Sequence, residues 1–63
     1  MFRKVSVEIL AEGVGADWEE ARKKANERSQ ILSQSHPGEE LIILYREIDI
    51  WTIAWYVVLC KKD

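Results

Sequence analysis

Few residues in this 63-residue chain could carry chemistry, and none of them completes a catalytic or ligand-binding motif. The nearest candidate is Gly13-Val14-Gly15, which lies between an alternating apolar segment and a helical one, where a glycine-rich turn can hold a phosphate. The full G-x-G-x-x-G pattern fails because Trp18 occupies the position of the third glycine. We therefore assign no nucleotide binding to this turn.

Acid–base, metal and thiol chemistry also lack the partner groups that they need. A general acid or base requires a histidine or carboxylate in a cleft beside a matched group, whereas the acids here fall on the outer face of a helix or at strand ends. His36 is the only histidine and Cys60 the only cysteine, so no internal disulfide and no clustered metal site can form. We predict a protein that is not an enzyme and has no catalytic residue, metal or cofactor.

The small size of the chain favours self-association. We expect a single domain over residues 1–63, with a core that buries only about 60% of the surface of the unfolded chain. Domains of this size usually gain stability from disulfides, a metal or another subunit. Because composition argues against the first two, we predict a homo-oligomer, with a dimer favoured.

Charge and hydropathy bear on partners and compartment. The net charge of −2 gives no overall field toward nucleic acid or anionic lipid, so we expect no membrane association and no general nucleic-acid binding. Asp49 and Thr52 interrupt the most apolar segment, which falls short of the ~20 residues of a membrane-spanning helix. The first residues alternate instead of forming a signal-peptide core, and the lone Cys60 fits a reducing compartment. We predict a cytoplasmic protein.

Hydrophobic periodicity predicts one helix between strands. Residues 3–11 alternate, with Val5, Val7 and Ile9 on the side that we expect to face the core. Gly13 and Gly15 then provide the freedom to turn out of the strand.

A helix is predicted from about Asp17 to Gln34. Asp17 and Glu20 form a box-like D-x-x-E start, and the Ser-His-Pro-Gly segment ends the helix. Glu20 and Lys24 form a favourable pair on the charged outer face, as do Glu19 and Lys23. The residues expected to face inward are Trp18, Ala21, Ala25 and Leu32, with Ile31 flanking them.

Two further strands are predicted over residues 39–46 and 48–60, with the link between them near residues 46–49. The order β-α-β-β requires a right-handed crossover, which makes the first two strands parallel. Because the third strand is the most apolar, we place it in the middle. The prediction is an α+β fold: a three-stranded mixed sheet in the order 1-3-2, with one helix packed on one face.

The third strand is apolar on both faces, which a single helix cannot cover. One face carries Ile48, Ile50, Thr52, Ala54, Tyr56, Val58 and Cys60. If the other face points away from the helix, it forms an exposed apolar interface for a second copy or a protein partner. The alternative is that this other face packs beneath the helix. The interface residues predicted on the first assignment are Ile43, Tyr45, Trp51, Ile53, Trp55, Val57 and Leu59.

The same topology gathers basic residues at one pole. The start of the first strand and the end of the third bring together Arg3, Lys4, Lys61 and Lys62. This basic pole complements the helix dipole, or contacts phosphate or an acidic partner.

The segments Lys4-Val5 and Trp18-Glu19-Glu20-Ala21, with the β-α-β-β order, resemble the dodecins. That family consists of small flavin-storing proteins that assemble through their sheets, and the resemblance covers the first strand and half of the helix. That family stacks flavin on a tryptophan of its second strand. The second strand predicted here has no tryptophan, so the chain departs from the family pattern at this point.

Three functions are therefore compared. The leading one is a non-enzymatic, self-associating interaction module that uses an apolar face of its sheet. The second is an oligomeric carrier of a planar aromatic small molecule, held between subunits by Trp51, Trp55 and Tyr56. The third is a nucleic-acid accessory protein that uses the basic pole.

Overall fold

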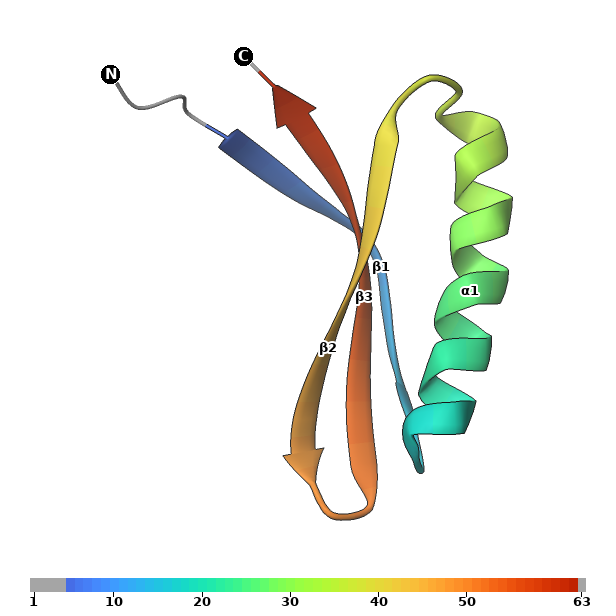
Figure 1. Cartoon of the computed structure of the whole chain (residues 1–63), viewed down its shortest axis with the longest axis vertical. Helices are drawn as coiled ribbons and strands as arrows, with labels where there is room; N and C mark the ends of the chain where they lie inside the picture. The colour runs from blue at the N-terminus through green and yellow to red at the C-terminus, as the bar shows by residue number, and fades with distance from the viewer. Residues whose placement is uncertain (1–4, 63) are drawn as a thin grey trace.

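The computed structural model describes residues 5–62 and has one helix packed on one side of a three-stranded sheet (Figure 1). The elements in chain order are β1 (Val5–Gly15), α1 (Trp18–Ser35), β2 (Glu40–Asp49) and β3 (Thr52–Lys62). No helix in this described part is both long enough and apolar enough to cross a membrane.

The sheet has the order β1-β3-β2, which confirms the predicted α+β fold. β3 pairs antiparallel with both neighbours, so the two outer strands run in the same direction as predicted. Because every hydrogen-bonded pair is antiparallel, the sheet is antiparallel and not mixed. The helix and the sheet form two layers, and the opposite face of the sheet has no covering element in the described chain (Figure 1).

The core lies between α1 and β3. Ala21 and Ala25 are fully buried and meet Ile53, Trp55 and Val57 of the central strand. Two alanines at the contact let the helix approach the sheet closely, as their spacing predicts. The residues that pack around this cluster are Ala11, Leu32, Leu41, Ile43 and Tyr45.

The prediction that Val7 and Ile9 face the core is wrong. β1 pairs in register with β3 up to Ile9, and the register then shifts between Ile9 and Ala11, which is the signature of a β-bulge. Because Leu10 is the extra residue, the alternation of side chains reverses there. Odd-numbered residues up to Ile9 point away from the helix, and those from Ala11 on lie on the helix side. Val7 is 61% exposed on the side away from the helix, whereas Ala11 lies on the helix side. The side chain of Val5 lies outside the described part.

Gly13 and Gly15 have a different role from the predicted one. Both belong to β1, and neither has a positive φ, so they do not turn the chain out of the strand. A Cβ on Gly13 would lie 2.4 Å from the Trp55 ring, and one on Gly15 would lie 2.6 Å from the backbone nitrogen of Ala21. The two glycines therefore let an indole and a helix pack directly against the strand.

The helix begins as its sequence predicts. Asp17 is the N-cap, and its carboxylate accepts a hydrogen bond of 2.8 Å from the Glu20 backbone N–H. The Glu20 carboxylate accepts from the Ala16 N–H at 3.3 Å and forms an ion pair of 2.8 Å with Lys24. The Lys24 hydrogen bond, then the Ala16 hydrogen bond, hold the pKa of Glu20 below its ordinary value. Glu20 thus joins the cap to the first turn.

Replacing Glu20 should change the acid sensitivity of the fold. Because the folded-state pKa is lowered, ionised Glu20 stabilises the fold above its unfolded pKa, and this contribution is lost as the pH falls through the folded pKa. Glu20→Gln should lower the urea midpoint at pH 7, and the gap from the wild type should close in strong acid. Urea unfolding followed by circular dichroism at several pH values measures this gap. Glu19→Gln is the control, and an equal gap at every pH would contradict the prediction.

The β2–β3 hairpin turns later than predicted. β2 extends through Asp49, and Ile50 and Trp51 form the two-residue connection. The Asp49 carboxylate accepts a 2.8 Å hydrogen bond from the Trp51 N–H, an Asx turn that holds the connection without glycine.

Candidate functional site

The residues predicted as an interface lie mainly in the core. Ile53, Trp55, Val57 and Leu59 are buried on the side of β3 that the helix covers. Assigning these four to an exposed surface is therefore wrong, and the alternative in which this face packs beneath the helix is the observed one.

The other three predicted interface residues divide between the core and the surface. Ile43 and Tyr45 are partly buried beside the core, and Trp18 packs edge-to-face on Tyr45 with ring centroids 5.7 Å apart. Trp51 is 74% exposed at the hairpin connection. Only Trp51 keeps the exposure that an interface residue needs.

The sheet face opposite the helix is the larger candidate surface. Because paired residues of antiparallel strands point to the same side, the register assigns side chains to this open face. Its residues in chain order are Val7, Ile9, Glu12, Val14, Glu40, Ile42, Leu44, Arg46, Thr52, Ala54, Tyr56, Val58 and Cys60. Ile48 borders a hollow on this face with Val14 and Tyr56.

The open face is apolar along its centre. Ala54 and Val58 are buried because the side chains of both flanking strands stand beside them. Ile9, Ile42 and Leu44 on the outer strands are exposed to solvent. Single exposed apolar residues are ordinary, but a contiguous apolar patch of more than a few hundred Å² usually marks an interface.

Charged residues of the open face lie on its outer strands. Glu40 and Arg46 lie on β2, opposite Cys60 and Ala54 of β3, and Glu12 lies on β1. The periphery can therefore add directional ion pairs to an apolar centre, which is the usual anatomy of a protein interface.

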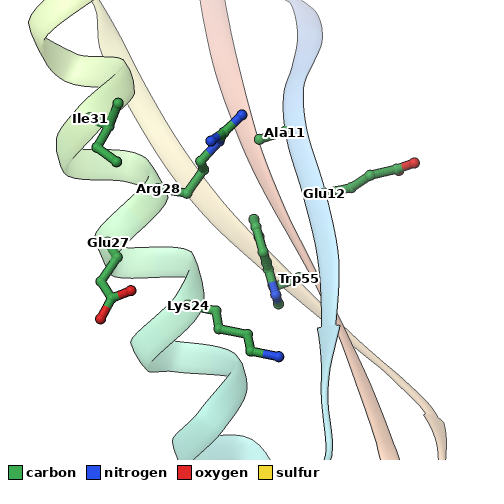
Figure 2. Close-up of a pocket in the computed structure, with 7 residues that line it drawn as sticks. All are labelled: Ala11, Glu12, Lys24, Glu27, Arg28, Ile31 and Trp55. Carbon is green, nitrogen blue, oxygen red and sulfur yellow. The ribbon is translucent and has the colours of Figure 1, made fainter.

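A groove between α1 and β1 is the second candidate surface. It has a volume of about 460 Å³ and is lined by Ala11, Glu12, Lys24, Glu27, Arg28, Ile31 and Trp55. Lys24 and Arg28 extend from the helix toward β1 beside the Trp55 ring, whereas the carboxylates of Glu12 and Glu27 point away (Figure 2). The interior of the groove therefore combines an aromatic floor with two cations.

Two observations in the groove bear on binding. Trp55 is 7% exposed, and its Nε1–H finds no acceptor among the residues that the structure describes. Lys24 donates to the Val14 carbonyl at 3.2 Å and pairs with Glu20, whereas Arg28 forms no ion pair within residues 5–62. Arg28 is thus the cation of the groove that is free to receive an acidic group.

The three aromatic residues predicted to line one pocket are not brought together. Tyr56 lies on the open face, Trp55 beneath the helix and Trp51 at the hairpin connection. The carrier site predicted between subunits would have to combine these side chains from more than one chain, and it stays a prediction.

The basic pole is only partly described. Arg3 and Lys4 lie outside the described residues, as does the side chain of Lys62. Lys61 forms an ion pair of 3.2 Å with Glu8 on the neighbouring strand. The one basic side chain of this group that the structure describes is thus already paired with an acid.

Metal ligands do not gather in the part of the chain that the structure covers, where no three His, Cys, Asp or Glu side chains form a candidate metal site. Cys60 is a free thiol, half-buried on the open face. Comparisons with protein-family models, with curated proteins and with solved structures found no match to this chain.

Proposed function

We propose that the protein is a non-enzymatic module that self-associates in the cytoplasm through the open face of its sheet, as a homodimer. The observation that carries this proposal is the contiguous apolar surface formed by Val7, Ile9, Val14, Ile42 and Leu44 around the buried Ala54 and Val58. This face has no cover within the described chain (Figure 1). A second copy can cover it because two such faces pack as a β-sandwich.

The size of the face suits a dimer of moderate strength. Three strands of this length present roughly 36 Å by 14 Å, or on the order of 500 Å² per chain. A face-to-face pair then buries about 1,000 Å² in total, at the lower end for specific interfaces. We therefore expect a dimer that dissociates on dilution through the micromolar range.

Charge complementarity favours one arrangement of the two copies. The arrangement has a twofold axis in the plane between the two sheets. The axis is perpendicular to the strands and passes between Val58 and Tyr56. It places β2 over the β2 of the partner, running in the opposite direction. In this arrangement Arg46 of each copy lies opposite the partner's Glu40. The two ion pairs would form at the periphery, where they set the register more than the affinity.

A charge on the open face should dissociate the dimer. Leu44→Lys places an ammonium in the apolar centre, so the variant should sediment as a monomer at concentrations where the wild type is a dimer. Gln34→Lys adds the same charge on the exposed side of the helix and should remain dimeric. Sedimentation equilibrium measures the molar mass in solution of the wild type and of the two variants. A wild type that is monomeric at several hundred micromolar would remove the proposal.

The twofold arrangement has its own test in the same assay. Arg46→Glu should weaken the dimer severalfold, because two acids then face each other, and adding Glu40→Arg should restore it by exchanging the two charges. If the loss of dimer stability in the double variant equals the sum of the losses in the two single variants, the copies pack in another register.

A further inference from the structure

The hairpin connection carries apolar side chains where turns usually place glycine or polar residues. Ile50 and Trp51 are 79% and 74% exposed, and we call this pair the tip. The Asp49 hydrogen bond to the Trp51 N–H holds the tip in one conformation. Exposed tryptophan on a fixed turn is the kind of side chain that dominates protein interfaces, because it buries a large area at little entropic cost.

The charges around the tip indicate what it can bind. Glu47 and Asp49 precede the tip and are exposed, so two acidic residues lie next to the apolar tip. A complementary site would combine an apolar cavity with cations at its edge. The groove between α1 and β1 has these properties, with the Trp55 ring and Ala11 at its floor and with Lys24 and Arg28 extending into it (Figure 2).

The size of the groove also fits the tip. Its volume of about 460 Å³ is within the range of sites that enclose a drug-sized molecule, so it can admit an indole side chain. Ile31 lines the groove and is exposed on the helix, which extends the apolar contact beyond the floor.

The tip does not fill the groove of its own chain. Trp51 borders a neighbouring hollow of about 270 Å³ with Gly15 and Thr52. Lys24 lines both this hollow and the groove, but Trp51 does not line the groove. A tip in a groove is therefore a contact between two chains.

We propose that the tip of one copy inserts into the groove of another. Trp51 then lies on the Trp55 ring, and the acidic Glu47 and Asp49 lie beside Arg28. This contact is heterologous, because the two surfaces differ, and it joins copies head to tail into a ring or a filament. The tip and the groove share only Glu12 with the open face, so the proposal goes beyond the face-to-face dimer and does not depend on it.

The experiment separates the two interfaces by working in Leu44→Lys chains, whose open face is disabled. These chains should still associate as their concentration rises, by sedimentation velocity. Adding Trp51→Ala or Arg28→Glu should each weaken this association at least tenfold. Lys23→Glu, a matched charge reversal on the same helix outside the groove, should leave it unchanged.

Mixing the two defective chains gives the sharpest result. The Trp51→Ala chain keeps an intact groove and the Arg28→Glu chain keeps an intact tip, so an equimolar mixture should form a heterodimer and stop there. Circular dichroism confirms that both variants fold. A mixture that remains monomeric overturns the proposal, and so does undiminished association of the Trp51→Ala chain.

A cross-link provides a second, independent measurement in the full chain. With Cys60→Ser as background, chains carrying Ile50→Cys and chains carrying Ile31→Cys should form a mixed disulfide more readily than either forms with itself. A chain carrying Lys23→Cys is the exposed control on the same helix. Equal yields with Ile31→Cys and with Lys23→Cys would overturn the assignment of the groove as the receptor.

Discussion

Trp55→Ala is expected to lower the free energy of unfolding by about 3 to 5 kcal/mol, the usual effect of truncating a buried aromatic residue. A chain of this length has a total stability of about 3 to 9 kcal/mol, so this loss is of the same order as the whole. Trp55 is buried between α1 and β1 and belongs to the central cluster with Ala21 and Ala25 (Figure 2). Neither alanine is large enough to fill the space that the indole leaves.

Urea unfolding followed by far-ultraviolet circular dichroism measures this effect, at a protein concentration low enough to keep all chains monomeric, because self-association contributes to apparent stability. Trp51→Ala is the matched control, since it removes the same side chain from an exposed position and should change stability by less than about 0.5 kcal/mol. Equal urea midpoints for the two variants would show that the indole of Trp55 does not support the core.

Gly15→Ala is expected to destabilise the fold by about 1 to 3 kcal/mol or more, although it adds a single methyl group. The new Cβ would lie 2.6 Å from the backbone nitrogen and 2.9 Å from the Cα of Ala21. Both contacts are with helix backbone, so no side chain can rotate away to relieve them. The whole first turn of α1 would have to move off the sheet, and the Asp17 cap with it.

Gly13→Ala provides the comparison, because its Cβ would meet the Trp55 ring instead of backbone. In a Trp55→Ala chain the methyl group at position 13 has room, so the two substitutions should couple and cost less together than the sum of their separate effects. Gly15→Ala combined with Trp55→Ala should instead be additive. Urea midpoints of the single and double variants test this difference, and additivity at both glycines would contradict the assigned contacts.

Much of the secondary structure follows from local chemistry. The D-x-x-E start at Asp17 and Glu20 and the Ser-His-Pro-Gly end predict the two ends of the helix to within a residue, because both signals depend on neighbouring groups alone. The alternation within β2 correctly separates Leu41, Ile43 and Tyr45 from Ile42 and Leu44. The strand order also follows, since the most apolar strand gains most from the central position.

The candidate surfaces could not be predicted from local sequence patterns in the same way. The bulge at Leu10 leaves no mark in the alternation of residues 3–11, yet it moves Val7 and Ile9 to the open face and leaves Ala11 and Gly13 beneath the helix. Alternation shows which residues share a face locally, but one inserted residue reverses the assignment for the rest of the strand. The place of Ile50 and Trp51 in the hairpin connection could not be predicted either, because apolar residues usually signal strand and not turn.

The amino-acid sequence by itself determined the elements, their order and the excess of apolar residues on β3, because these depend on spacing and side-chain type. Only the tertiary structure decided which of the two faces of β3 meets the helix. That choice depends on close packing: Ala21, Ala25, Gly13 and Gly15 leave room for the bulky row of Ile53, Trp55 and Val57, and the row of Ala54 and Val58 is left facing outward. Steric fit between segments far apart in the chain has no local signature, so it appears only when the elements are assembled.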